Sequence, residues 1–389
     1  MMRGKLIAMM LPLGMLAACG GAGPQSVGSV APPAPTGGTG STGGTASGGT
    51  GAGVTGGSGN GGTTATAHFL AVSAATTFDA VGAMHSFKKD NVTGGELYQG
   101  NASTVRAPSG TIAYDPRDGI FTVSFTDDKA GITNTTRYQD PAHRTDFNPR
   151  SQPEYEVPNL EGFNYLAAAD EEYGVNTFFY QRPGNATTYV TLAGFSRSKD
   201  DAIERKAEHG VFAFGTQTAS TQIPIKGTGS YTGGFIATAV LNPTFDSARP
   251  SENYFQWLVG SSTVAVDFGK STMSLGFEGT VNSTFFENDR ISDVALSFPT
   301  GTIFKAGATA AIDFARSGGF TGEFQSASLG SQAIDFARVS PGSSTAGASS
   351  LDGAFYGPDA VNLGGNFRIV GGVPDQRIDI QGAFTGAKK

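Results

Sequence analysis

The chain ends in residues 351–389, LDGAFYGPDAVNLGGNFRIVGGVPDQRIDIQGAFTGAKK, and this stretch decides the fold. From residue 377 onward apolar and polar side chains alternate, with Ile378, Ile380 and Phe384 on one face and Arg377, Asp379, Gln381 and Thr385 on the other. This period of two predicts a β-strand with one buried and one solvated face. Phe367 and Ile369 indicate a preceding strand, and the Gly-Gly-Val-Pro at residues 371–374 predicts the turn between the two. The chain therefore closes on a hairpin that needs a sheet or a barrel to pack against.

Glycines and aromatic residues recur in a fixed order through the C-terminal half of the chain. The motifs are GTGSYTG at 227–233, TVAVDFGK at 263–270, GFTGEF at 319–324 and GAFYGPDAVNLGGNF at 353–367, followed by GAF at 382–384 and GAK at 386–388. In this order they resemble the β-barrel domain of transferrin-binding protein B and its relatives, over residues 222–389. The resemblance implies an eight-stranded antiparallel β-barrel that follows a smaller β-rich handle domain.

Strand patterns in the same region predict a mainly all-β fold. Val264, Val266 and Phe268 alternate with polar or small residues, and the hexapeptide AIDFAR at 311–316 recurs at 333–338. In both copies Ile and Phe share a face, as successive barrel strands require. Inward Phe, Ile and Val predict a filled interior. Polar outward residues, Arg368, Arg377, Asp379, Gln381, Asp313 and Asp335, are the reverse of a lipid-facing belt, so we expect a soluble barrel.

Residues 1–18 have the pattern of a lipoprotein signal peptide. Arg3 and Lys5 precede an apolar core, and Leu16-Ala-Ala-Cys19 matches a bacterial lipobox. The alternative is an ordinary secretory signal, but Cys19 is the only cysteine and has no partner for an internal disulfide. We therefore predict Cys19 as the lipid anchor, acylated with palmitate or a similar chain. Gly20 beside it favours export to the outer membrane.

Residues 19–64 follow the signal as a lipidated linker. Positions 20–64 are almost wholly Gly, Ser, Thr, Ala and Pro and carry no charge. Side chains this small bury too little apolar area to offset the entropy of ordering, so a disordered tether is expected. Random-coil scaling gives it a root-mean-square reach of about 37 Å.

Residues 65–221 predict a β-rich handle-like domain ahead of the barrel domain at 222–389. Residues 111–114 and 120–125 flank the turn sequence DPRDG, and residues 176–181 and 187–195 flank RPGN, so two hairpins are expected. Apolar residues at helical spacing in 72–89 predict one helix. The four prolines in 139–158 predict a long surface loop, which either binds a ligand or only connects strands. The charged segment 198–209 predicts a solvated loop or short helix.

The charge balance argues against a nucleic-acid partner. The formal net charge is −7, and loss of Arg3 and Lys5 with the signal leaves −9. Phosphates would repel such a chain, and the charge mainly favours solubility.

Motifs for catalysis and metal binding are missing from the sequence. No Gly-x-Ser-x-Gly elbow occurs, and Gly269-Lys270-Ser271 lacks the glycine that a phosphate-binding loop needs five positions earlier. The histidines, His68, His85, His143 and His209, are widely spaced, which favours exposed or capping roles over a haem or metal ligand. The single tryptophan, Trp257, is expected in the core rather than exposed to a partner. We predict no enzyme, no cofactor and no metal site.

The resemblance also implies a function. It is that of an outer-membrane or cell-surface lipoprotein which binds a host or environmental protein, or an iron- or haem-containing compound, and presents it to a TonB-dependent transporter. Transferrin-binding protein B has two lobes, whereas this chain has room for one handle and one barrel. The matched motifs contain no contact residue of the family, so the ligand-binding residues are unknown. The alternative is a structural or decoy surface lipoprotein without cargo.

Overall fold

The computed structural model describes residues 69–93, 96–102, 104–105, 108, 110–127, 132–139, 157–170, 173–182, 187–242, 254–286, 289–291, 298–315, 318–337, 349–373 and 376–389. Most of these residues lie in antiparallel strands, so the predicted mainly all-β class is confirmed. Thr64–Lys389 forms one compact unit. Within the ranges above, no helix has the length and apolar character needed to cross a membrane.

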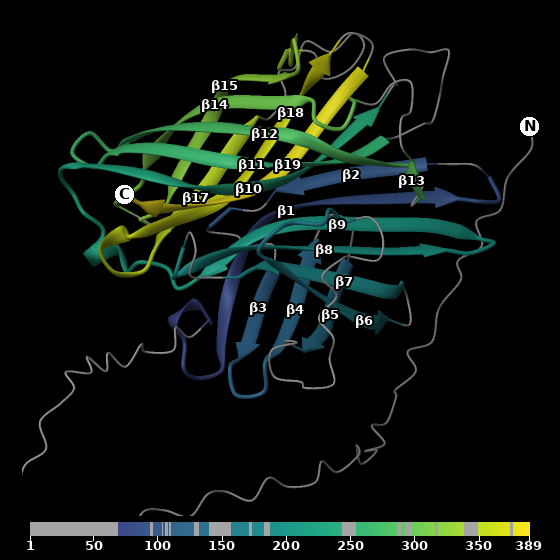
Figure 1. Cartoon of the computed structure of the whole chain (residues 1–389), viewed down its shortest axis with the longest axis horizontal. Coiled ribbons are helices and arrows are strands. Elements are labelled where there is room, and N and C mark those ends of the chain that lie inside the picture. Colours follow the sequence, from purple (N-terminus) through teal and green to yellow (C-terminus); the bar gives the residue numbers. More distant parts are fainter. Residues whose placement is uncertain are drawn as a thin grey trace, which may run out of the picture. The chain divides into compact units, whose positions relative to one another are not determined.

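The first sheet is built around β1. Its strands are β1 (Thr76–Asp90), β2 (Glu96–Ala102), β3 (Gly110–Asp115), β4 (Ile120–Asp127), β5 (Ile132–Gln139), β6 (Phe163–Asp170), β7 (Gly174–Gln181), β8 (Val190–Asp200) and β9 (Glu204–Gly215). They follow the order β5-β4-β3-β1-β9-β8-β7-β6, with β2 paired to β1. Figure 1 shows β1 as a long curved strand, which pairs with β3 near its start and with β2 and β9 farther along. The two predicted hairpins are present as β3–β4 and β7–β8.

Two predictions in this sheet are wrong. Residues 72–89 are not a helix, because Thr76–Asp90 is β1. The middle of β1, from Ala80 to His85, is buried on both faces, and a strand with few polar positions also satisfies helical spacing. Residues 198–209 are not one continuous loop or helix, because 198–200 end β8 and 204–209 begin β9, and only 201–203 form an exposed turn. Their charges pair across the hairpin, as between Lys199 and Glu204, which lets a charged sequence form strands.

The second sheet closes on itself. It contains β10 (Thr228–Asn242), β11 (Tyr254–Asp267), β12 (Thr272–Phe286), β13 (Asp289–Ile291), β14 (Ile303–Ile312), β15 (Phe320–Leu329), β16 (Gln332–Ala333), β17 (Ser350–Tyr356), β18 (Asn362–Val373) and β19 (Gln376–Lys388). The order β11-β10-β19-β18-β17-β15-β14-β12 is completed by pairing of β11 with β12, so these eight strands form a barrel (Figure 1). The eight-stranded antiparallel barrel is thus confirmed, and closure leaves none of its strands as an edge.

Aromatic side chains fill the barrel, as predicted. Phe277 lies at their centre, with ring centroids 4.9 Å from Phe367, 5.7 Å from Phe235 and 5.4 Å from Phe384. Val264, Val266 and Phe268 point into the same core. The centroid distances and the tilted or edge-to-face orientations of these rings are those that aromatic pairs favour.

The repeated hexapeptides do not form two further strands of their own. β14 ends at Ile312, after which the Gly318 amide donates to the Asp313 carbonyl and turns the chain. In the second copy β16 ends at Ala333, and the Asp335 side chain accepts a bond from the Ala337 amide. Asp side chains favour such local turns over a continued ladder. Residues 371–373 of the predicted turn lie in β18, which continues to Val373, and Pro374 lies outside the described residues.

Candidate functional site

The structure brings together three of the residues that the sequence singled out. His85 on β1 and His209 on β9 are direct cross-strand partners, and both are buried. Trp257 on β11 is fully buried beside them, which confirms its predicted core position. Cys19, His68, His143 and residues 140–156 of the predicted proline-rich loop lie outside the described residues. The prediction of exposed or capping histidines is therefore wrong for His85 and His209.

These residues belong to a contact between the two sheets, which we call the inter-sheet seam and define by His85, Ser196, His209, Thr238, Phe255, Trp257, Arg368 and Asp379. The polar face of β19 was predicted to be solvated, but Asp379 and Gln381 are 2% and 0% exposed. They are covered because this face of the barrel packs on β1, β8 and β9. The Asn366 side-chain amide crosses the seam and donates to the Gly82 carbonyl at 2.6 Å. Both faces of the closing hairpin are thus buried.

His85 links β1 to two barrel strands. Its Nδ1 lies 2.9 Å from Oγ1 of Thr238 on β10, and its Nε2 lies 3.8 Å from Oδ1 of Asp379 on β19. Arg368 on β18 donates two hydrogen bonds to the same carboxylate, at 3.1 and 2.6 Å. Burial lowers the pKa of His85, and the adjacent Asp379 only partly opposes this shift.

His209 has a less polar environment. Its Nδ1 lies 3.0 Å from Oγ of Ser196, and its ring stacks on Phe255 with centroids 4.1 Å apart. The Trp257 ring stands edge-on, with its centroid 6.4 Å away. Burial lowers the pKa of His209 to about 3, and the nearby His85 adds to the shift. The imidazole is therefore neutral at physiological pH.

An apolar cluster flanks these polar groups. Trp257 meets Phe179 of the first sheet edge-on at 5.6 Å, and Leu192 and Val211 join it from β8 and β9. Ile236 and Ala383 complete the cluster from the barrel. Burial of these side chains stabilises the contact between the sheets, while the polar groups fix its register.

A second buried ionic cluster lies on the opposite face of β8 and β9. Arg197 and Glu208 are paired across the hairpin, with side chains 3% and 2% exposed. The Tyr173 hydroxyl donates to Glu208 at 2.8 Å, and the Arg197 guanidinium lies 4.3 Å from the Tyr173 ring centroid. Neither cluster is a metal site: among the described residues no group of three or more His, Cys, Asp or Glu side chains is placed to hold an ion.

The ends of two hairpins form an exposed surface, which we call the hairpin tip and define by Val92 and Ile203. These side chains are 76% and 70% exposed. Asn91 joins the turns, because its amide donates to the Ile203 carbonyl at 2.9 Å and its side chain donates to the Asp201 carbonyl at 2.6 Å. Asp90 and Asp201 cap the two turns by accepting bonds from backbone amides. The tip therefore presents two aliphatic side chains on a hydrogen-bonded frame.

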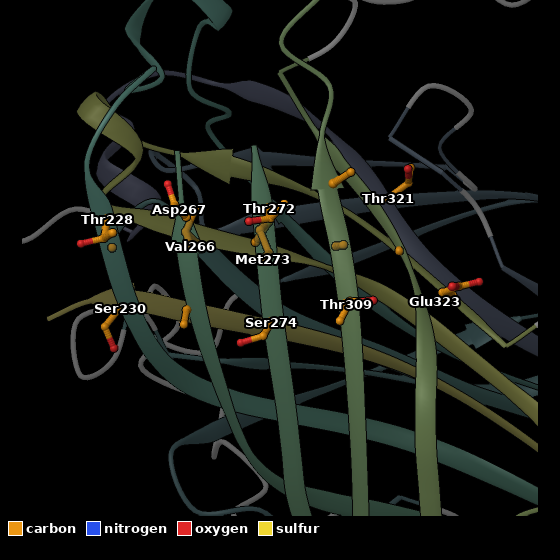
Figure 2. A pocket seen from close by; sticks show the side chains of 15 residues that line it. Thr228, Ser230, Val266, Asp267, Thr272, Met273, Ser274, Thr309, Thr321 and Glu323 are labelled. Atoms are coloured by element: carbon orange, nitrogen blue, oxygen red, sulfur yellow. The ribbon is translucent and has the colours of Figure 1, made fainter. Parts of the chain in front are cut away.

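A shallow groove of about 1100 Å³ lies on the outer side of the barrel. Figure 2 shows short side chains along neighbouring strands, among them Thr228, Ser230, Thr272, Ser274, Thr309 and Thr321. The charged members of the lining are Asp267 and Glu323. Asp267 is already paired with Lys270 at 2.9 Å. Among the described residues that line the groove, no polar side chain is buried.

Fold and seam together define the class: a β-protein in which a curved, barrel-like sheet with its own aromatic core packs on a closed, filled eight-stranded barrel. No family model matches the sequence, and no curated protein matches it. Among solved structures, it is similar to a mutant transferrin-binding protein B from Haemophilus parasuis, with 15% identity, TM-score 0.34 and coverage of 82% of this chain and 76% of that one. Transferrin-binding protein B from serogroup B Neisseria meningitidis gives 10% identity, TM-score 0.27 and coverages of 82% and 77%. The structure of a surface lipoprotein is also similar, with 14% identity, TM-score 0.29 and coverage of 80% of this chain and 99% of that one.

Sequence reasoning missed the seam because its members are distant along the chain. The available signal was the pair of polar residues Asp379 and Gln381 on a strand whose other face is apolar, but a solvated face has the same pattern. The hairpin tip was missed because residues 198–209 were not predicted as strands.

Proposed function

We propose that the protein is an outer-membrane lipoprotein, held by Cys19, that binds a ligand at the cell surface and presents it to a TonB-dependent transporter. In this proposal residues 1–18 direct export, residues 19–64 tether the protein, and residues 65–221 and 222–389 are the handle-like and barrel domains. The lipobox and the ordered glycine-aromatic motifs support this reading. The ligand is a protein or an iron- or haem-containing compound.

The observation that carries ligand binding is the hairpin tip. Single exposed aliphatic residues are ordinary on protein surfaces, but Val92 and Ile203 lie on adjoining turns that are bonded to each other. Such a frame loses little conformational entropy on binding, which favours a protein partner. The charges around the tip are paired internally, as between Lys88 and Glu204 at 3.0 Å, so contact there would be mainly apolar.

Affinity capture tests the proposal. The full-length chain is immobilised in detergent, exposed to solubilised outer membrane from the native cell, and its bound proteins are identified by mass spectrometry. We expect recovery of a TonB-dependent transporter from the outer membrane. In a parallel capture from the fluid that surrounds the native cell, we expect a protein ligand that the V92S/I203S variant fails to retain. Ile225→Ser is the matched control, because Ile225 is equally exposed, at 74%, but precedes β10 rather than lying at the tip.

The filled barrel favours the second candidate, a structural or decoy surface lipoprotein without cargo. Its aromatic core offers no internal chamber for a small ligand among the described strands. Recovery of lipoprotein export factors alone, with no transporter, would contradict the uptake role and support this alternative. Under both proposals Cys19 anchors the protein to the outer membrane.

A further inference from the structure

The two buried histidines of the seam differ in the charges that face them. His85 faces the carboxylate of Asp379 and, behind it, the guanidinium of Arg368, and it also contacts Thr238. His209 faces the Ser196 hydroxyl, the rings of Phe255 and Trp257, and His85 itself. His85 thus has an anion that can pair with an imidazolium, whereas the contacts of His209 with described residues are neutral apart from the other histidine.

Among the described residues, the closed seam therefore offers no anionic partner to a protonated His209. A buried cation is strongly destabilised unless it is paired, and stacking on the Phe255 ring offsets only part of this cost. The hydroxyl of Ser196 supplies one hydrogen bond, but it brings no charge. His209 is only 7% exposed, so water reaches a small part of the imidazolium and can solvate it fully only if the two sheets move apart at this point.

We propose that His209 is an acid sensor, whose protonation loosens the first sheet from the barrel while each sheet remains folded. His85 contributes the smaller part of this acid response, since burial lowers its pKa as well but a protonated His85 gains an ion pair with Asp379 that partly opposes the shift. This inference concerns the fold alone and does not depend on the proposed function.

The direction of the pH effect follows from proton binding. Because burial lowers the pKa of His209 to about 3, the open state binds more protons than the closed state below the ordinary pKa of about 6.5. The stability of the closed seam is complete above pH 6.5 and decreases progressively as the pH falls toward 3. Between pH 7 and pH 5 the ratio of open to closed protein should rise about 25-fold through this one group.

Trp257 provides a reporter in the right place. It is the only tryptophan in the chain, it is fully buried, and its ring contacts that of His209. Opening of the seam exposes it to water and shifts its emission to the red. Far-UV circular dichroism reports the strands of both sheets independently.

Urea titrations of the full-length chain in detergent at pH 7 and pH 5 provide the test. At pH 7 we expect the fluorescence and dichroism transitions to coincide, whereas at pH 5 fluorescence should change at lower urea. In His209→Gln most of the separation at pH 5 should disappear, and in His85→Gln most of it should persist. Coincident transitions for the wild-type protein at both pH values, or equal behaviour of the two variants, would overturn the proposal.

Backbone hydrogen exchange on the wild-type protein is a second test that needs no variant. After correction for intrinsic rates, peptides from β1, β9, β10 and β19 at the seam should exchange faster at pH 5, while β12 and β14 on the far side of the barrel should not. Uniform acceleration through both sheets would indicate global unfolding and contradict a seam that opens by itself.

Discussion

Arg368 and Asp379 come from neighbouring barrel strands and meet beneath the first sheet, where Nε and Nη2 of the arginine donate to the two carboxylate oxygens at 3.1 and 2.6 Å. The carboxylate is buried, and His85 approaches it from β1. The pair therefore joins β18, β19 and β1 at one point. A bidentate arginine also restricts the geometry of this contact more than a lysine would.

Asp379→Asn should strongly destabilise the protein. Arg368 and His85 would lose their anionic partner, and removing one member of a buried pair typically costs 3–5 kcal/mol. We expect the free energy of unfolding in urea at pH 7 to fall by about 3 kcal/mol. Asp267→Asn is the control, because its pair with Lys270 lies on the surface, and it should leave the urea midpoint almost unchanged. Equal effects of the two substitutions would contradict a structural role for the buried pair.

The same carboxylate sets a second acid response. Burial raises the pKa of Asp379, but His85 and Arg368 lower it by more, so the net pKa is below its ordinary value. The group therefore stabilises the fold above about pH 4, and this stabilisation is lost as the pH falls further. The stability difference between wild type and Asp379→Asn should accordingly shrink between pH 4 and pH 2 in urea titrations. A constant difference would show that the carboxylate has an ordinary pKa.

The sequence predicts those parts of the fold whose pattern lies within a single strand or hairpin, and it does not predict contacts between distant segments. The closing hairpin was predicted because Ile378, Ile380 and Phe384 alternate with polar residues, and the structure places these three in the barrel core. The polar face of this strand was wrongly predicted to be solvated. A polar face that packs on a second sheet has the same alternating sequence pattern as a face exposed to water. His85 and Asp379 are hundreds of residues apart, so their contact arises only from the packing of the sheets.

β1 was wrongly predicted as a helix, because its sequence pattern does not show which secondary structure it forms. Its central residues are buried on both faces, and an apolar run without alternation cannot distinguish helix from strand. At the hairpin tip, cross-strand charge pairs stabilise strands that the sequence favoured as a solvated loop. Local patterns therefore predicted the barrel well, and they failed where the two sheets meet and at the exposed tip.

Trp257→Ala should weaken the contact between the sheets. Removing a fully buried tryptophan leaves a cavity bordered by Phe179, Leu192 and Ile236, and such substitutions cost about 3–5 kcal/mol. Urea unfolding followed by circular dichroism should show this loss at pH 7. Trp257→Phe keeps part of the contact and should lose less. If alanine and phenylalanine were equally tolerated, the apolar cluster would contribute little to the seam.

Gly82 should not accept a side chain. A Cβ there would lie 2.4 Å from the Val211 carbonyl oxygen and 2.1 Å from Cδ1 of Phe212, and the Gly82 carbonyl also accepts the bond from Asn366. We expect Gly82→Ala to cost about 1–3 kcal/mol in urea unfolding, because β1 and β9 must separate. Gly234→Ala on β10 is the matched control, since its nearest neighbour would lie 3.4 Å away, and it should be tolerated. The reverse order of stabilities would contradict the close approach at β1.

The anchor prediction is tested by Cys19→Ser in the native cell. Only a thiol can form the thioether of a bacterial lipoprotein, and Cys19 is the sole cysteine of the chain, so incorporation of labelled palmitate should be abolished rather than reduced. The variant protein should leave the outer-membrane fraction, because residues 20–64 contain no apolar segment that would hold it there. Ser26→Ala within the linker is the control and should keep both the label and the membrane fraction. Palmitate that remained on Cys19→Ser would place the acyl chain on another residue, and an unlabelled wild-type protein would favour the ordinary secretory signal.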